Sequence, residues 1–234
     1  MKVIFLGKNK PSVIKGLRYL IKNKINVVAI AGVTEKNYPN IPVLTDNQLY
    51  LKKFLDIDII ISYLYTKKIK KSFLSLPKIG CINFHPAPLP NLRGVSGYSF
   101  GIFKGVKEWG VSAHFVDKDF DTGDIIKVKK FSINSDKETA FSLEEKSQLH
   151  LYELFKETID IILKKEVLPR IKQKKGHYYS KKEFEELRKI RNTDNLATID
   201  KKIRGCWFPP YPGASINIKS KEFTLINDKI LKEI

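Results

Sequence analysis

An amide, an imidazole and a carboxylate have the types and the spacing in this sequence that acyl transfer requires. Asn83 and His85 stand two residues apart at the end of an apolar run that predicts a strand, and Asp121 lies 36 residues after His85 in a glycine turn. In an extended segment, side chains at i and i+2 point to one face, and a parallel sheet opens its ligand crevice at the carboxyl ends of its strands. An amide can donate to a developing oxyanion, an imidazole can move a proton, and a carboxylate can orient the imidazole.

Plainer interpretations exist for these residues taken singly. A lone histidine at a strand end is more often a hydrogen-bonded structural residue, and residues 121–124 alone could be only a turn between strands. The three side chains together favour the chemical interpretation, in which Asn83 donates, His85 shuttles a proton, and Asp121 orients His85 and accepts a proton.

Three prolines follow His85 within five residues, at positions 86, 88 and 90. Proline continues neither a strand ladder nor a helix interior, and the residue before it avoids the helical region. We therefore expect a stiff loop below the site that keeps His85 extended, while the sequence leaves open which X-Pro bonds are cis.

Short apolar runs alternate with helical periodicity along the chain, which predicts an α/β fold with a Rossmann-like, mostly parallel sheet. The first turn, residues 7–11, lacks the pattern G-x-G-x-x-G, which disfavours a nicotinamide-dependent dehydrogenase. We expect a catalytic domain over residues 1–170 and a small C-terminal region over residues 171–234. We expect strands over residues 2–7, 27–33, 57–62 and 80–84. We expect a first helix that is capped by Ser12 and ends at residue 21, and two further helices over residues 141–165 and 184–190. A β-hairpin is expected over residues 216–225.

The chain of 234 residues carries a formal net charge of +18, which ordinarily raises the expectation of nucleic-acid binding. Of its 43 basic residues, 37 are lysines spread along the whole length, whereas arginine is the preferred residue for bidentate phosphate and base contacts. We interpret the charge as a solvated lysine surface that attracts an anionic substrate. Because no apolar run reaches membrane-spanning length and no signal-peptide pattern occurs, we expect a soluble, cytoplasmic protein without membrane contact, and Cys81 and Cys206 fit a reducing compartment.

With these residues in view, the chain resembles the folate-dependent formyltransferases, most strongly over residues 80–126. That family includes the glycinamide ribonucleotide, methionyl-tRNA and sugar N-formyltransferases, and its hallmark is Asn-x-His followed, 36 residues after the histidine, by the aspartate of Asp-x-Gly. The resemblance implies the Rossmann-like formyltransferase fold, 10-formyltetrahydrofolate as formyl donor and no metal. It also implies that Asn83 hydrogen-bonds the formyl oxygen, that His85 stabilises the tetrahedral intermediate and assists proton transfer to the departing folate nitrogen, and that Asp121 holds His85 and deprotonates the ammonium.

The resemblance further implies a pterin slot that is read largely by backbone groups. Tyr63 and Tyr65 could equally be buried packing residues, and we expect a structural role for His114. The positions that match the slot are Val116, Asp117 and Lys118 on one wall and Tyr63, Leu64 and Tyr65 on the other.

The tail over residues 203–214 is similar to the segment that follows the core in sugar N-formyltransferases. Trp207 or Tyr211 could stack on a nucleobase, and Arg204 or Arg93 could pair with a diphosphate. An aromatic plug over the core or a dimer contact is the alternative. The resemblance thus favours a nucleotide-linked amino sugar as acceptor, above all a dTDP-4-amino-4,6-dideoxyhexose used in surface polysaccharides such as lipopolysaccharide O-antigen. A 3-amino sugar and a UDP-linked sugar stay open, because nothing in the sequence reports the ring position or the nucleotide.

Other acceptors stay open. The chain leaves too little length for the basic C-terminal domain of the tRNA enzyme, and the purine enzyme usually lacks a pair like Arg93-Gly94. A non-catalytic folate-binding module is the remaining alternative. Family analogy and the apolar side chains of the tail imply a homodimer formed through the C-terminal hairpin.

Overall fold

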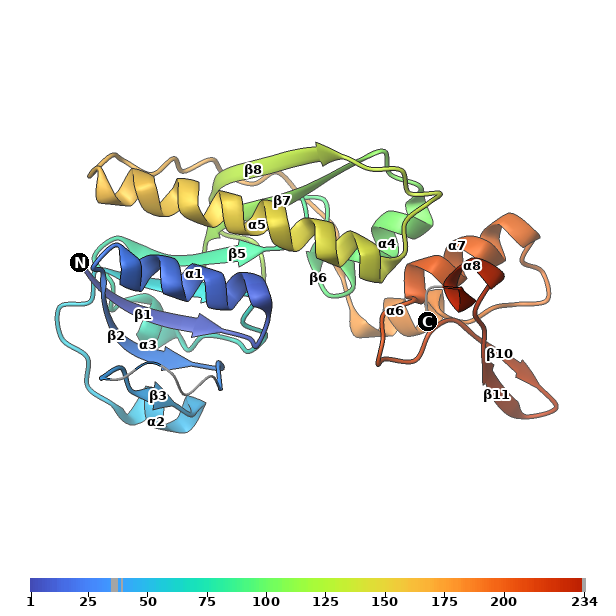
Figure 1. The fold of residues 1–234 in the computed structure, drawn as a ribbon, viewed down its shortest axis with the longest axis horizontal. Coiled ribbons are helices and arrows are strands. Elements are labelled where there is room, and N and C mark those ends of the chain that lie inside the picture. The colour runs from blue at the N-terminus through green and yellow to red at the C-terminus, as the bar shows by residue number, and fades with distance from the viewer. Residues whose placement is uncertain (35–37, 39, 233–234) are drawn as a thin grey trace.

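A seven-stranded sheet forms the centre of the molecule, whose computed structural model describes residues 1–34, 38 and 40–232 (Figure 1). Its strand order is β3-β2-β1-β4-β5-β7-β8. The first five strands run parallel to one another, whereas β7 pairs antiparallel with β5 and β8 pairs antiparallel with β7. The predicted Rossmann-like, mostly parallel sheet is therefore confirmed. The strands are β1 (Lys2–Gly7), β2 (Asn26–Ala31), β3 (Val43–Leu44), β4 (Ile59–Tyr63), β5 (Gly80–His85), β7 (Glu108–Phe115) and β8 (Ile125–Ser132).

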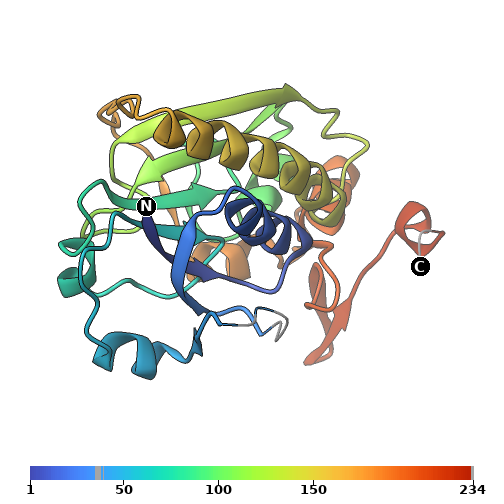
Figure 2. The same ribbon diagram turned by 60° about the vertical axis from the view of Figure 1, so that its left-hand side comes forward.

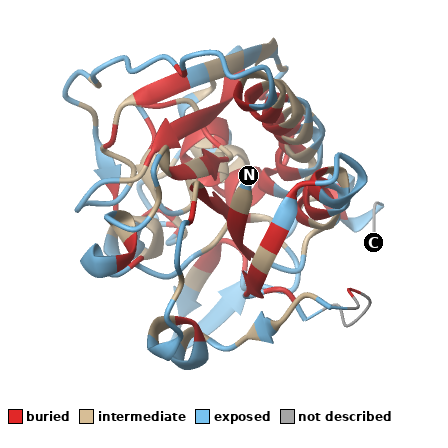
Figure 3. Ribbon diagram, turned by 90° about the vertical axis from the view of Figure 1, so that its left-hand side faces the viewer, coloured by how far each residue is buried: buried red, intermediate tan, exposed pale blue. Residues whose placement is uncertain are grey.

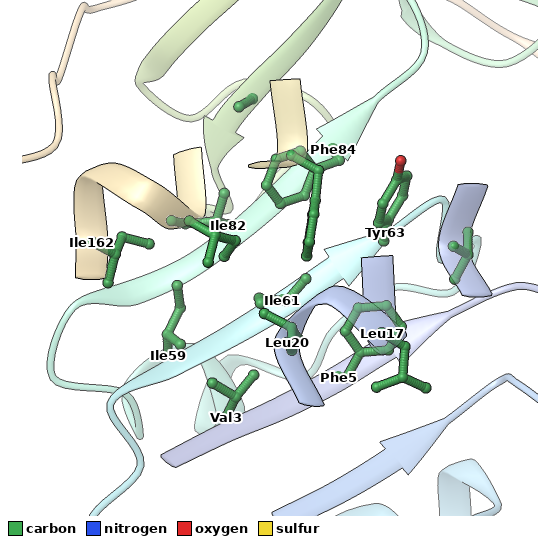
Figure 4. Packing of buried hydrophobic residues seen from close by; sticks show 14 of the residues in the cluster. Val3, Phe5, Leu17, Leu20, Ile59, Ile61, Tyr63, Ile82, Phe84 and Ile162 are labelled. Atoms are coloured by element: carbon green, nitrogen blue, oxygen red, sulfur yellow. The ribbon is translucent and has the colours of Figure 1, made fainter. Parts of the chain in front are cut away.

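Helices cover both faces of this sheet. On one face α1 (Pro11–Lys22) and the long α5 (Ala140–Leu163) pack over β1, β4 and β5, and their buried leucines and isoleucines join the strand residues in the largest apolar cluster (Figure 4). On the other face α2 (Asp46–Leu51) and α3 (Lys71–Leu74) cover the strands through Leu49 and Phe73. Burial on both sides explains why β4 reads as a continuous apolar run rather than an alternating one (Figure 3).

A second apolar cluster fills the space between α4 (Gly97–Lys104), the start of β7 and the C-terminal elements. The C-terminal elements are α6 (Lys181–Leu187), α7 (Leu196–Cys206), the hairpin of β10 (Ser215–Ile218) and β11 (Lys221–Thr224), and α8 (Asp228–Leu231). A two-stranded pairing of β6 (Arg93–Gly94) with β9 (Tyr178–Tyr179) ties this region to the loop after β5. Residues far apart in sequence therefore meet at the end of the sheet where β5 finishes.

Most of the expected elements are present, with shifted ends. The first helix begins at Pro11 with Lys10 as its N-cap residue, so the prediction of Ser12 as the cap is wrong. Proline suits the first helical position because its missing N–H has no partner there, and the Ser12 hydroxyl instead bonds Gln148 of α5. The helix expected over 184–190 is shifted, at Lys181–Leu187 with a capping box from Ser180 and Glu183.

The C-terminal hairpin forms as predicted and extends away from the sheet (Figure 2). Ile218 and Phe223 on it are about half exposed. The dimer expected through this hairpin stays a prediction, as does the division of the chain at residue 170. Within the described residues no helix is long and apolar enough to cross a membrane, and Cys81 and Cys206 are buried free thiols.

The Phe155 ring of α5 gives a test of how the core is held together. It is fully buried, and its centroid lies 5.2 Å from that of Tyr63 and 4.9 Å from that of Phe84. Phe155→Ala should lower the free energy of unfolding by about 3–5 kcal/mol because it leaves a cavity where two strands meet the helix. Leu149→Ala, on the exposed side of the same helix, should change it by less than about 0.5 kcal/mol. Urea denaturation of both variants measures the difference, and equal losses would contradict this assignment of the core.

Candidate active site

Strand register sets three polar side chains in a row across the sheet. Ser62 of β4 pairs with Asn83 of β5, and Asn83 pairs with His114 of β7. The Ser62 hydroxyl lies 2.8 Å from Asn83 Oδ1, and Asn83 Nδ2 lies 3.0 Å from His114 Nε2. The Asn83 amide is therefore held from both sides by neighbouring strands.

The hydrogen bonds of His114 fix which way the Asn83 amide faces. His114 Nδ1 lies 2.7 Å from the carbonyl oxygen of Phe115, so this nitrogen carries the hydrogen and donates it. In the neutral ring Nε2 then accepts, and the group opposite it must be the NH₂ of Asn83. One N–H of that NH₂ is used by His114, and the other is left to donate to a substrate oxygen.

His85 is oriented by the proline loop that follows it. Its Nε2 lies 2.9 Å from the carbonyl oxygen of Leu92 and donates to it, so Nδ1 faces the site. The loop is held in turn by Ser112, whose hydroxyl donates to Ala87 O at 2.8 Å and accepts from Leu89 N at 3.0 Å. His85 is the last residue of β5 and is therefore extended, as predicted, and the Leu89-Pro90 bond of the loop is cis.

Asp121 lies between the two histidines. Its Oδ1 is 3.6 Å from both His85 Nδ1 and His114 Nε2, and its Oδ2 accepts a hydrogen bond of 2.9 Å from Gly94 N. The residue has a left-handed φ of 57°, in a turn that folds tightly onto β7. A Cβ on Gly123 would lie 1.9 Å from Phe115 O, so the Asp-x-Gly turn needs its glycine at this position.

The C-terminal region closes the aspartate turn from outside. Gln173 Nε2 donates to Asp121 O at 3.0 Å and to Gly123 O at 2.6 Å. Its Oε1 accepts from Arg93 at 2.8 and 3.1 Å. Arg93 is thus a positioning residue that links the loop after β5 to the turn before β8.

The electrostatics of the site favour an ionised Asp121. Burial raises the pKa of this carboxyl group, but the charge of His85, the nearby His114 ring and the Gly94 N–H outweigh it. The net effect holds the pKa of Asp121 well below its usual range. The carboxylate can therefore receive a proton during a reaction and is not protonated beforehand at neutral pH.

Asn83, His85 and Asp121, singled out from the sequence, are thus brought together at the carboxyl end of β5. His114, expected to be structural, belongs to the same cluster, because it contacts both Asn83 and Asp121. Its position opposite Asn83 depends on the antiparallel register of β5 and β7, which the sequence did not reveal. The backbone groups of Leu92 and Gly94 carry no side-chain signal and were missed for that reason.

The segments matched to a pterin slot lie at the adjacent strand ends. Tyr63 is fully buried between Phe84 and Phe155, so its side chain packs the core and forms no wall. Tyr65 donates its hydroxyl hydrogen to Asp46, and Leu64 has a left-handed φ of 56°. The two walls approach each other, because Lys68 Nζ lies 5.8 Å from the centroid of the Phe120 ring, in the loop that also holds residues 116–118. Val116 N donates to Cys81 O, and the Asp117 carboxylate accepts from Thr122 within that loop.

The residues expected to bind an acceptor differ in how far their side chains are exposed. Arg204 is 3% exposed, and its guanidinium donates to Asp200 and to the carbonyl oxygens of Ser135 and Glu138. It is not available to a diphosphate, so that prediction is wrong. Trp207 is half-buried against the second apolar cluster, whereas Tyr211 is 60% exposed. Pairing of Arg93 with a diphosphate stays a prediction.

Within the tail over residues 203–214, the sequence did not reveal which aromatic and cationic side chains contact one another. Phe208 stacks on Tyr98 of α4 with ring centroids 6.4 Å apart and an interplanar angle of 15°. Lys10 Nζ lies 5.6 Å from the centroid of the same Phe208 ring and 2.9 Å from a carboxylate oxygen of Glu144. A groove of about 450 Å³ opens next to Lys10, lined by Asn9, Lys15, Arg18 and Thr34 among others.

No group of three or more His, Cys, Asp or Glu side chains is arranged to hold a metal ion in the described part of the chain. The chemistry of the cluster described above is that of hydrogen-bond donation and proton transfer.

Comparisons with known proteins agree on one kind of chemistry. The family model described as "Formyl transferase" matches residues 1–159. A methionyl-tRNA formyltransferase of Orientia tsutsugamushi is 32% identical over 97% of this chain and 81% of its own length. A GDP-perosamine N-formyltransferase of Brucella melitensis is 34% identical over 72% of this chain and 64% of its own length. The crystal structure of an N-formyltransferase of Helicobacter canadensis with folinic acid and dTDP-3-aminofucose has a TM-score of 0.75 and 25% identity, covering 94% of this chain and 85% of that one.

The lowered pKa of Asp121 predicts how the stability of the protein depends on pH. A group whose pKa is depressed on folding stabilises the protein above its unfolded pKa, here near 3.8, and this contribution is lost as the pH falls toward the folded value. The free energy of unfolding of the wild type should therefore exceed that of Asp121→Asn at pH 5. The excess should shrink by about 1–2 kcal/mol on going to pH 2.5. Denaturant titrations at several pH values measure it, and a pH-independent difference would show that the carboxylate is not ionised by its surroundings.

Proposed function

Because this chain belongs to the formyl transferase family, whose members carry out folate-dependent formyl transfer, we propose that it moves the formyl group of 10-formyltetrahydrofolate to the amino group of a nucleotide-linked amino sugar. The observation that carries the acceptor assignment is the aromatic segment containing Phe208 and Tyr211. Phe208 of this segment packs on Tyr98 of α4. Helix α4 starts at Gly97, three residues after Gly94, whose N–H donates to Asp121, so the chain connects the aromatic segment closely to the aspartate.

The geometry of the triad accounts for the chemical step. The free N–H of Asn83 donates to the formyl oxygen as the acceptor nitrogen adds to the formyl carbon, which stabilises the oxyanion of the tetrahedral intermediate. Asp121 accepts the proton that the nitrogen loses. His85 directs Nδ1 toward both Asp121 and the site, so it can take this proton from Asp121 and pass it to the folate nitrogen as the bond of that nitrogen to the formyl carbon breaks. The products are the N-formylated acceptor and tetrahydrofolate.

A folate donor fits the surroundings of the triad. The segments after β4 and β7 lie on neighbouring strand ends beside Asn83, and Lys68 and Phe120 connect them. The Helicobacter canadensis structure, which has the same fold over most of this chain, contains folinic acid. We therefore assign the donor slot to Leu64, Tyr65, Val116, Asp117 and Lys118, with Tyr63 contributing only its backbone.

A nucleotide-linked acceptor fits the aromatic segment and the lysines at the start of α1. The exposed ring of Tyr211 offers a surface on which a base can stack, while Trp207 supports the segment from within. Lys10 and Lys15 take the place of Arg204 as the cations for a diphosphate, at the amino end of the twelve-residue helix α1, where backbone N–H groups also favour an anion. The amine of a 4-amino-4,6-dideoxyhexose would then reach Asp121, and the product would serve surface polysaccharide synthesis.

Methionyl-tRNA is the second candidate acceptor. The methionyl-tRNA formyltransferase of Orientia tsutsugamushi matches nearly the whole of this chain, and the net charge of +18 suits a polyanion. The sugar acceptor is preferred because of the aromatic segment beside the site and because the Helicobacter canadensis structure contains dTDP-3-aminofucose.

Incubation of the purified protein with 10-formyltetrahydrofolate and a panel of acceptors distinguishes these candidates. The panel contains dTDP-, UDP- and GDP-linked amino sugars, methionyl-tRNA and glycinamide ribonucleotide. We expect mass spectrometry to show a formylated sugar nucleotide, with a dTDP-linked 4-amino sugar reacting fastest. Formylation of methionyl-tRNA with none of the sugars would overturn the proposed acceptor and leave formyl transfer intact.

The role of His85 is tested by His85→Ala. This variant should lose formyl transfer by about a hundredfold or more in kcat while it stays folded, because it removes the proton-transferring group. His150→Ala is the matched control, since His150 contacts Phe131 and Glu153 rather than the triad, and it should keep near-normal activity. Full activity of His85→Ala would contradict the catalytic role and favour a non-catalytic folate-binding module.

A further inference from the structure

A cavity of about 660 Å³ lies on the far side of the loop that orients His85. The loop contributes Pro88 and Leu92 to its wall, the end of α4 contributes Lys104, and the segment before β9 contributes Lys175. That segment rests directly on the loop, because a Cβ on Gly176 would lie 1.8 Å from Pro90 O. The triad residues do not line this cavity, so it is separate from the site of formyl transfer.

The charged side chains around the cavity leave an excess of positive charge. Lys130 forms an ion pair of 2.8 Å with Glu108, the one carboxylate in the wall. Lys104 donates to the Tyr179 hydroxyl and lies 5.0 Å from the centroid of that ring. Among the described residues, no carboxylate oxygen lies within 4 Å of the ammonium groups of Lys104 or Lys175. Two lysines without a carboxylate partner therefore line one open cavity, which favours a ligand with two negative charges.

Part of the wall is apolar. Pro88, Leu92, Val106 and Trp109 line it, and Trp109 Nε1 donates to Pro86 O at 3.2 Å, which fixes the indole in place. Pockets of 300–1,000 Å³ with an apolar lining and a few polar groups are typical of small-molecule sites. A phosphate monoester carries between about −1.5 and −2 charges at neutral pH, and its organic part can bury apolar surface.

The cavity also shares a residue with the catalytic cluster. Leu92 lines it with its side chain, and the Leu92 carbonyl oxygen accepts the hydrogen bond from His85 Nε2. His177, also in the wall, accepts with its carbonyl oxygen from Arg93 N, next to the Gly94 N–H that binds Asp121. We propose that this cavity is a second ligand site, for a small organic phosphate, whose occupation is transmitted to His85 through Leu92.

Phenyl phosphate is a suitable probe because it combines a dianion with an apolar ring and carries no nucleoside. The protein has two tryptophans, so Trp207→Phe leaves Trp109 in the cavity wall as the single tryptophan, whose fluorescence can be excited selectively over that of tyrosine. Phenyl phosphate should change the Trp109 fluorescence saturably, and Lys175→Glu in this background should raise its Kd at least about tenfold. Lys174→Glu is the matched control with the same change of charge one residue away, outside the wall, and it should alter Kd by less than about twofold.

Equal weakening by Lys174→Glu and Lys175→Glu would overturn the site, since only a lysine surface would then bind the anion. Saturable binding of benzyl alcohol as tight as that of phenyl phosphate would overturn the assignment of a phosphate ligand. Absence of any saturable change would also reject it.

Transmission to His85 is tested without any acceptor by NMR of histidine-labelled protein. The His85 Cε1–H resonance, assigned by its loss in His85→Gln, should shift with phenyl phosphate in the wild type and not in Lys175→Glu. A shift of His177 alone, with His85 unchanged, would keep the ligand site and overturn its link to the catalytic residue. Because neither measurement uses formyl transfer, both stand apart from the choice of acceptor.

Discussion

The rest of the site depends on how the largely buried carboxylate of Asp121 is compensated by the groups around it. A charge taken out of water is costly unless hydrogen bonds and opposite charge compensate it. Here the compensation comes from three separate parts of the chain: His85 at the end of β5, His114 in β7 and the Gly94 N–H in the following loop. None of these groups is adjacent to Asp121 in sequence. The carboxylate is therefore compensated in its largely buried position only when strand, loop and turn are assembled together.

That requirement explains why so much of the chain supports the site without entering it. The sheet register holds Asn83 between Ser62 and His114, and Ser112 holds the proline loop that orients His85. Gln173 and Arg93 hold the aspartate turn from outside. Rigid support of this kind keeps catalytic groups within the small tolerances that transition-state stabilisation needs. The C-terminal region therefore contributes to the catalytic geometry as well as to the surroundings of the acceptor.

Chemistry and acceptor recognition are carried by different kinds of residue. The triad works through fixed hydrogen bonds on strand ends, and its geometry is indifferent to what the amine is attached to. The proposed recognition of the acceptor involves the 206–211 segment and the groove beside Lys10, where aromatic and cationic side chains are partly exposed. The cavity behind Leu92 adds a third surface that touches the catalytic histidine only through the backbone.

The fold class, the strand that carries Asn83 and His85, the proline loop and the turn of Asp121 could be predicted from the sequence, because apolar runs, proline and Asp-x-Gly act over a few residues. Other features were decided only by the tertiary structure. His114 entered the site through the register of β7, and Arg204, read as a cation for substrate, became a buried donor to Ser135 and Glu138. Tyr63 turned inward to pack on Phe155. Whether a polar or aromatic side chain faces a substrate or the core depends on which segments pack against it, and that information is spread over residues distant in the chain.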